Sequence, residues 1–226
     1  MARLPQHLAK RPVGRERLSR EELGRHQRRN IIEAATGVFA KRGYQASTVE
    51  NIAAAAKIAV GSFYLHFANR EDCLLGAYEL VVGEAREQIA VAVAAESGWP
   101  AQALAALHEL LALIAARPLA ARLALVEIQT GGPVALERYG ETLEFVIASL
   151  EGGRKVATVD PPPPATQEMA TANGLAWLLA QRLLHGEAKD IEGLFGQMAE
   201  VVLEPYLGAA QTRREIAAFE KALIPG

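Results

Sequence analysis

The polar side chains between residues 47 and 70 have types and spacing suited to binding phosphate groups. Tyr64 and His66 can each donate a hydrogen bond to a phosphate oxygen, and Arg70 adds a positive charge close by. Thr48 stands at an expected helix start, where it offers a hydroxyl group together with free backbone N–H groups. A row of phosphates, as in a nucleic-acid backbone, is a ligand that such a set could bind.

Two short helices are expected to position these groups. The first is capped by Ser47 or Thr48, and after a turn of three or four residues the second carries Phe63 and Phe67 on one inward face. This pattern, over residues 48–67, predicts a helix-turn-helix unit whose second helix enters the DNA major groove. The alternative is an ordinary helical hairpin whose aromatic residues are core. The residues left on or near the outer face of the second helix are Ala59, Val60, Gly61, Ser62, Tyr64 and His66.

The charge distribution supports a polyanionic partner at the amino-terminal end. Residues 1–70 hold 13 lysines and arginines against 5 aspartates and glutamates, a formal balance of +8, whereas the whole chain has a net charge of -2. Residues 1–20 are expected to form a flexible basic arm. A helix with a capping box at Ser19 and Glu22 should follow, with Arg28 and Arg29 as candidate DNA-binding residues in its first half. We hypothesise that the arm adds phosphate or minor-groove contacts; the alternative is a solvated tail.

The segment "FAKRGYQASTVENIAAAAKIAVGSFYLHFANREDCLL" resembles the amino-terminal DNA-binding domain of the TetR family of bacterial transcriptional repressors. The resemblance covers roughly Arg28 to Leu75 and is most specific in the block "GSFYLHF" followed by "NRE". Two positions depart from the family pattern. At Ala59 the family usually has a hydroxyl side chain that caps the recognition helix, and at Val60 it often has a long polar residue. We therefore expect few hydrogen bonds from side chains of this helix to base edges. The resemblance implies DNA contacts at Thr48, Ala59, Val60, Gly61, Ser62, Tyr64, His66 and Arg70.

The composition and periodicity predict an all-α fold of about nine to ten helices. The helix-turn-helix DNA-binding domain is expected at residues 21–70, and a larger helical effector-binding and dimerisation domain at residues 71–226. The prolines of "VATVDPPPPAT" should form an extended spacer, and "RREIAAFEKAL" a frayed end. The densest apolar stretch, "LLALIAA", is too short to span a membrane, and the first residues lack an apolar signal segment. We therefore expect a cytoplasmic protein with no membrane partner.

Two carboxy-terminal helices are expected to form a homodimer interface. The first, roughly residues 167–185, is apolar on two sides, so one side should face its own domain and the other a partner. The TetR resemblance implies the same arrangement, a four-helix interface between two copies; the alternative is a monomer with a thick core. The residues assigned to the interface are Ala172, Ala176, Leu179, Leu183, Leu194, Phe195, Met198 and Val202.

The resemblance also implies a pocket for a small effector in the larger domain. Few aromatic residues and few buried-looking charges favour an apolar, uncharged effector. Candidate lining residues are His108, Glu127, Gln129, Tyr139, Phe145, Trp177 and Gln181. For each of them, a structural role in the core or on the surface is the alternative.

Catalytic and metal-binding patterns do not emerge from the sequence. The five histidines, at positions 7, 26, 66, 108 and 185, show no i,i+4 pairing and no neighbouring cysteine. Neither Gly131-Gly132 nor "EGGRK" has phosphate-loop spacing, and no Gly-x-Ser-x-Gly elbow occurs. We expect no catalytic residue, metal or cofactor. The predicted function is a regulator, most simply a repressor, released from a palindromic operator by a small effector; the alternatives are a small all-helical enzyme and a DNA-binding protein controlled by a protein partner.

Overall fold

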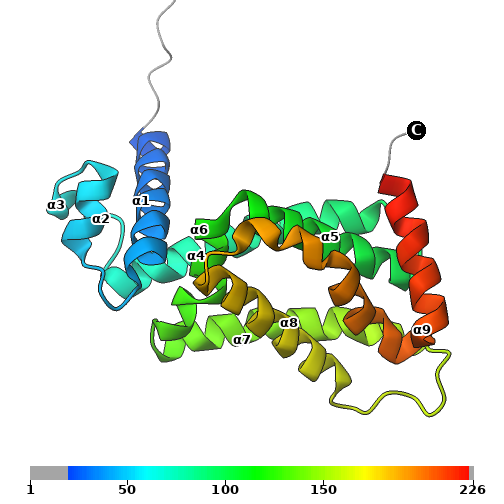
Figure 1. Cartoon of the computed structure of the whole chain (residues 1–226). Helices are drawn as coiled ribbons and strands as arrows, with labels where there is room; N and C mark the ends of the chain where they lie inside the picture. Colours follow the sequence, from blue (N-terminus) through cyan, green and yellow to red (C-terminus); the bar gives the residue numbers. More distant parts are fainter. Residues whose placement is uncertain (1–19, 224–226) are drawn as a thin grey trace, which may run out of the picture.

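A computed structural model describes residues 20–223, and every regular element in that range is helical (Figure 1). The predicted all-α fold is confirmed, with nine α-helices in the described residues. The amino-terminal arm and the proposed cap at Ser19 lie outside this range. The α-helices are α1 (Arg20–Arg42), α2 (Val49–Ala56), α3 (Val60–Phe63), α4 (Arg70–Ala94), α5 (Trp99–Ala116), α6 (Pro118–Leu125), α7 (Pro133–Leu150), α8 (Gln167–Leu184) and α9 (Phe195–Leu223). Short 3-10 helices are η1 (Glu127–Thr130), η2 (Glu151–Lys155), η3 (Ala188–Asp190) and η4 (Glu192–Leu194).

Helices α1, α2 and α3 lie together at one end of the molecule, and α4 runs from them into the larger bundle (Figure 1). Their apolar stripes meet in one core, in which Phe39, Phe63 and Ile52 are fully buried. The same core extends to Leu123 of α6 and Ile128 of η1. The small domain is therefore packed directly onto the larger one.

The larger domain has a second core, built from α5, α6, α8 and α9. Helix α5 is long and apolar enough to cross a membrane by length and composition, but Leu104, Leu107 and Leu111 are buried against neighbouring helices. The apolar composition of α5 is thus explained by packing within the bundle.

Helix α9 bends at Gly208 and continues to Leu223, so the predicted frayed end is wrong. Gly208 has φ of 72°, a left-handed conformation that favours glycine, and it separates two helical arms. The second arm is anchored by Ile216, which is buried, and by Phe219, whose ring packs 5.7 Å from that of Phe195. This apolar contact keeps the last arm in place.

The proline segment after η2 packs along α9 instead of standing free as a spacer. Arg154 donates hydrogen bonds to the carbonyl oxygens of Pro163 at 3.1 Å and Pro164 at 2.7 Å. The backbone N–H groups of Thr158 and Val159 both donate to the carbonyl of Tyr206. Because residues 156–164 have no helix of their own to satisfy these groups, the contacts with α9 fix their path.

Candidate nucleic-acid interface

Helix α2 starts at a complete capping box. The backbone N–H of Asn51 donates to the Thr48 hydroxyl oxygen at 3.3 Å, and the backbone N–H of Thr48 donates to the Asn51 side-chain oxygen at 3.2 Å. The predicted cap at Thr48 is confirmed. The Thr48 side chain is exposed, and its hydroxyl also interacts with the Glu50 carboxylate, whose pKa this hydrogen bond lowers.

The turn between α2 and α3 is built on one left-handed residue. Lys57 has φ of 56° and ψ of 44°, although it is not a glycine, and the backbone N–H of Ile58 donates to the carbonyl of Ala53 at 3.0 Å. This conformation costs about 1 kcal/mol for a residue with a side chain, so the surrounding packing must hold it. Asn30 of α1 contributes, because its side-chain amide donates to the carbonyl of Ala56 at 3.1 Å.

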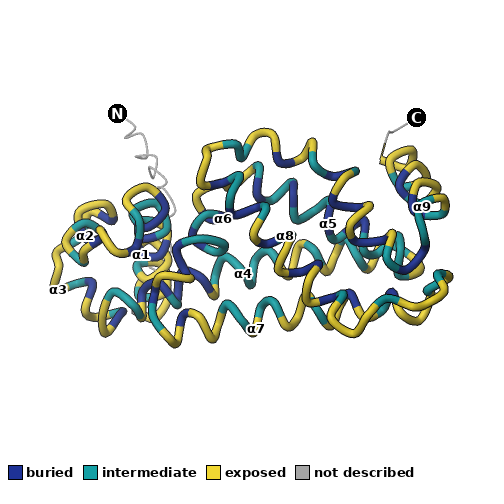
Figure 2. The backbone as a smooth tube through the Cα atoms, turned by 60° about the horizontal axis from the view of Figure 1, so that its bottom comes forward, coloured by how far each residue is buried: buried dark blue, intermediate teal, exposed yellow. Residues whose placement is uncertain are grey.

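Helix α3 and the turn after it, up to Phe67, bury two phenylalanines and expose most of their other side chains. Phe63 and Phe67 are buried, with ring centroids 5.5 Å apart, while the outer residues lie on the exposed rim of the small domain (Figure 2). Val60 is 37% exposed, Tyr64 54% and Leu65 80%. Ala59 and Gly61 are also exposed, and Ser62 is half-buried. Leu65 was not assigned a role from the sequence, since its place in the turn after α3 gives it no periodic signal.

His66 is less available than the sequence suggested. The residue is half-buried, and its Nε2 atom is buried without a hydrogen-bond partner. In this conformation Nε2 cannot donate to a phosphate, because α3 and its turn direct that atom inward. The expectation of a phosphate contact through this nitrogen is therefore corrected.

The three arginines expected at the interface all have partners within the chain. The Arg28 guanidinium lies 4.9 Å from the centroid of the Phe67 ring, and that of Arg70 lies 4.2 Å from the Tyr44 ring. Arg70 also donates to the carbonyl of Ser47 and so positions the loop before α2, while a DNA contact by its charge stays a prediction. Arg29 is exposed and paired with Glu33 and Glu84 at 3.3 and 2.9 Å.

Two glutamates connect the small domain to the larger one. The buried carboxylate of Glu127 accepts a hydrogen bond from the backbone N–H of Tyr44 at 2.8 Å and one from Arg122 at 3.2 Å. Glu84 of α4 bridges Arg29 of α1 and Arg117, at the start of α6, over 2.9 and 2.7 Å. Movement of α4 would therefore act on α1 through Arg29, and movement of η1 would act on the loop before α2 through Tyr44.

The residues predicted to line an effector pocket do not converge on one cavity. Glu127 is the link just described. The rings of His108 and Phe195 lie edge to face, 5.7 Å apart, and Phe145 is exposed beneath the Arg86 guanidinium. Trp177 is 65% exposed. The remaining three candidates, at half-buried or exposed positions on different helices, are Gln129, Tyr139 and Gln181. The structure therefore does not bring these seven residues together. Core packing, a surface location or an internal ion pair accounts for most of them.

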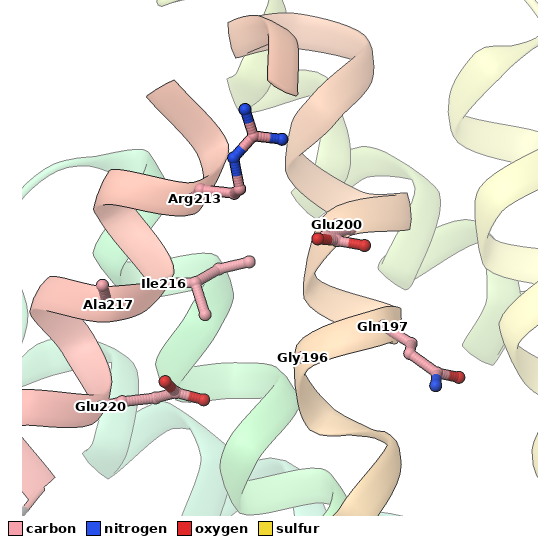
Figure 3. A pocket seen from close by; sticks show the side chains of 7 residues that line it. All are labelled: Gly196, Gln197, Glu200, Arg213, Ile216, Ala217 and Glu220. Carbon is pink, nitrogen blue, oxygen red and sulfur yellow. The ribbon is translucent and has the colours of Figure 1, made fainter. Parts of the chain in front are cut away.

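Two pockets in the described residues both involve α9. One, of ≈ 430 Å³, lies between the two arms of α9, with Glu200 and Gln197 on one arm and Arg213 and Glu220 on the other (Figure 3). The second, of ≈ 620 Å³, lies between the first arm and the prolines of residues 161–164. None of the seven predicted lining residues contributes to either pocket.

The apolar stripe predicted to face a second subunit is instead part of the chain's own core. The buried or half-buried residues of that stripe are Ala172, Ala176, Leu179, Leu183, Leu194, Phe195, Met198 and Val202. The exposed large apolar residues of α8 and the first arm of α9 are Met169, Trp177, Leu184 and Val201. The stripe faces inward because α8 lies against α6 and α7.

Comparisons with known proteins agree with this geometry. Residues 31–77 match the family model of "Bacterial regulatory proteins, tetR family". The chain is 48% identical over 44 residues to the HTH-type transcriptional repressor DhaR of Mycobacterium sp. (strain GP1), covering 20% of this chain and 22% of DhaR. It is 41% identical over 59 residues to the fatty acid metabolism regulator protein of Bacillus subtilis (strain 168), covering 26% and 30%. The matches thus span less than a third of these curated relatives.

Structural neighbours extend over most of the chain. FadR from Bacillus halodurans, a fatty acid degradation regulator, has a TM-score of 0.69 and 21% identity, covering 78% of this chain and 94% of its own. FadR from Bacillus subtilis, in complex with stearoyl-CoA, has a TM-score of 0.66 and 20% identity, covering 80% and 98%. At these identities the likeness establishes the fold. The matched family consists of regulators and not enzymes, which decides against the enzyme alternative.

Proposed function

We propose that this chain, which belongs to the TetR family of bacterial regulatory proteins through its amino-terminal domain, is a transcriptional regulator that binds a palindromic operator as a homodimer. The observation that supports it best is the division of α3. Its aromatic face is buried in the domain, and its opposite face is exposed from Ala59 to Leu65. Such an element is shaped to lie in a groove of duplex DNA.

The phosphate contacts are proposed for groups that remain exposed. Thr48 at the start of α2 and Tyr64 after α3 present hydroxyls, and Lys57 presents a cation on the turn between them. Gly61 and Ser62 allow the backbone to approach the duplex closely. These contacts fix the orientation of the small domain without selecting a base.

The homodimer is proposed to form through the exposed faces of α8 and the first arm of α9. Trp177 and Val201 are 65% and 50% exposed, and Met169 and Leu184 are 52% and 44% exposed. A second copy covering this apolar area would remove it from water. Two-fold symmetry would then present two α3 helices to half-sites about 34 Å apart or a multiple of that spacing.

Release from DNA is proposed to follow the binding of a small, apolar effector to the larger domain. The effector can act only if it prefers the arrangement that does not fit the operator. The links from Glu127 to Tyr44 and from Glu84 to Arg29 give it a route to the small domain. Because one structural neighbour is in complex with stearoyl-CoA, that molecule is the first probe to test, with coenzyme A alone as its control.

Control by a protein partner is the second candidate. It is favoured by the position of the two pockets, which lie along α9 and not between α4 and α8. An effector bound in either of these pockets would not lie next to α4. Failure both of acyl-CoA compounds and of uncharged apolar molecules to alter DNA binding would favour this candidate.

The test of DNA binding is a titration of the full-length chain into labelled DNA from upstream of its own gene, at several salt concentrations. Nanomolar binding with a steep salt dependence is expected. The variant Val60→Asp should abolish it, since it places a negative charge on the face of α3. Val146→Asp on α7 is a matched control, because Val60 and Val146 are 37% and 38% exposed. Equal binding by both variants would contradict the proposal.

A further inference from the structure

We infer that α3 selects its operator by contacting thymine methyl groups, and not by hydrogen bonds to base edges. The inference rests on the proposed function and adds the chemistry by which the bases are recognised. Its starting point is the set of side chains that the exposed face of α3 offers: Ala59, Val60 and Leu65.

The amino-terminal residues of a recognition helix are those that reach the base edges. In α3 these are Ala59, Val60 and Gly61, and all three are exposed. Ala59 is the N-cap residue, and its side chain makes no capping hydrogen bond. None of the three has a side-chain donor or acceptor, so a polar base edge meets only methyl groups or backbone there.

Several polar side chains around α3 are engaged or directed elsewhere, while Lys57 and Tyr64 remain exposed and are assigned to phosphates in the proposed function. Thr48 and Asn51 complete the capping box at the far end of α2, and Arg70 donates to the carbonyl of Ser47. The Nε2 atom of His66 is buried. No arginine, lysine, asparagine or glutamine occurs from Ala59 to Phe67, so α3 and the turn after it lack the long donor that would read guanine and the amide that would read adenine.

The exposed apolar side chains suit one major-groove group. Thymine carries a 5-methyl group that cytosine lacks, and an apolar side chain discriminates the two by contact alone. Leu65, in the turn after α3, is 80% exposed, the highest value among the large apolar residues described, and it offers a second exposed apolar surface besides that of Val60. Lys57, exposed beside this surface, and the excess of positive charge in residues 1–70 favour DNA as the occupant over an apolar protein segment.

The experiment removes the methyl groups from the DNA and leaves the protein intact. A duplex selected from random DNA by the full-length chain is resynthesised with deoxyuridine replacing thymidine at one position at a time. At one or two positions in each half-site, binding should weaken by about fourfold, the effect of one buried methyl group. Deoxyuridine outside the half-sites should leave binding unchanged.

Coupling to the protein distinguishes contact from an altered DNA shape. In Val60→Ala or Leu65→Ala, both at exposed positions, the unsubstituted duplex should bind a few-fold more weakly, and deoxyuridine at the contacted position should then have no further effect. An undiminished effect of deoxyuridine in both variants would overturn the inference, as would full binding to a duplex with no thymine methyl groups. In either of these outcomes the regulator still binds DNA, whereas failure to bind any duplex would overturn the proposed function itself.

Discussion

The carboxylate of Glu127 accepts a hydrogen bond from the backbone N–H of Tyr44 over 2.8 Å, across 83 residues of sequence. The same carboxylate pairs with Arg122 at 3.2 Å, and the residue is 4% exposed. A buried carboxylate needs such partners, because leaving it unpaired in the interior is costly. The link joins the loop before α2 to η1 of the larger domain.

Replacement of Glu127 by Ala should destabilise the protein by about 2–3 kcal/mol, because it leaves the Tyr44 N–H without its partner and Arg122 without its counter-charge. Urea unfolding at pH 7 measures the loss. Glu137→Ala, at an exposed position on α7, is the control and should change stability by less than about 0.5 kcal/mol. Equal stability of the two variants would show that the link contributes nothing.

The role of Glu127 could not be predicted from the sequence. The helix-turn-helix region could be predicted because its signals are local: the cap at Thr48 and the spacing of Phe63 and Phe67 lie within a few residues of each other. The partner of Glu127 lies 83 residues away, and no local pattern indicates it. A glutamate on an apolar stretch was therefore interpreted as a pocket residue.

The prediction of which side of α8 faces a second subunit was wrong for a different reason. It is apolar on two sides, and periodicity does not say which side meets the chain's own core. The structure buries Ala176 and Leu179 and leaves Trp177 exposed. In the same way, residues 213–223 were expected to be frayed, although Ile216 among them is buried and continues the packing.

Replacement of Trp177 by Glu should convert the proposed homodimer into monomers. The side chain is 65% exposed in the single chain, so the fold should be unaffected, while a charge at the centre of an apolar interface should be strongly unfavourable. Analytical ultracentrifugation measures the change, and operator affinity should fall with it because one α3 is lost. Val91→Glu, at a residue 73% exposed on α4, should remain dimeric. If the Trp177→Glu protein remained dimeric, the interface could not lie at Trp177.

A buried carboxylate gives the larger domain a pH-dependent stability. The Glu168 carboxylate accepts hydrogen bonds of 2.7 Å from both Arg154 and Tyr206. Burial opposes its ionisation, but these hydrogen bonds outweigh burial and lower the pKa of Glu168 below its ordinary value of 4.5. A group whose pKa is lower in the folded state contributes stability that is complete above the unfolded value and is lost as the pH falls through the folded value.

The unfolding free energy should therefore decrease below about pH 4.5 with a contribution from Glu168, and Glu168→Gln should make that decrease shallower. At pH 7 the same variant should be less stable by about 1–2 kcal/mol, because the charged hydrogen bonds to Arg154 and Tyr206 become neutral ones. Urea unfolding between pH 3 and pH 7 measures both. Glu192→Gln, at an exposed position, is the control. An identical acid limb in the Glu168→Gln and native proteins would exclude this contribution.

Cys73 should be unreactive in the native protein. The residue is fully buried near the start of α4, and burial raises the pKa of its thiol to about 12. The position at a helix start, which would favour a thiolate on a surface, is outweighed by the loss of solvation. A thiol-specific reagent such as 5,5′-dithiobis(2-nitrobenzoate) should label about one thiol in urea and almost none in buffer. Rapid labelling in buffer would indicate that this end of α4 opens readily.

The basic arm, residues 1–20, should contribute to operator affinity through phosphate or minor-groove contacts. The arm is rich in lysine and arginine, whereas the exposed side chains at Val60 and Leu65 are apolar, so affinity must come in part from outside α3. Deleting residues 2–17 removes five lysines and arginines and one glutamate. If some of these cations displace counterions from DNA, the slope of log affinity against log salt should flatten by about one to three.

The control keeps the length of the arm and changes its charge. In the variant with Arg11, Arg15 and Arg17 replaced by Gln, the slope should flatten nearly as much as in the deletion, because counterion release depends on charge and not on chain length. Anisotropy titrations of the native operator between about 50 and 200 mM salt resolve changes of this size. The same slope for the native chain, the deletion and the Gln variant would mean that the arm does not approach the duplex, and that α2, α3 and their turn supply the whole of the binding.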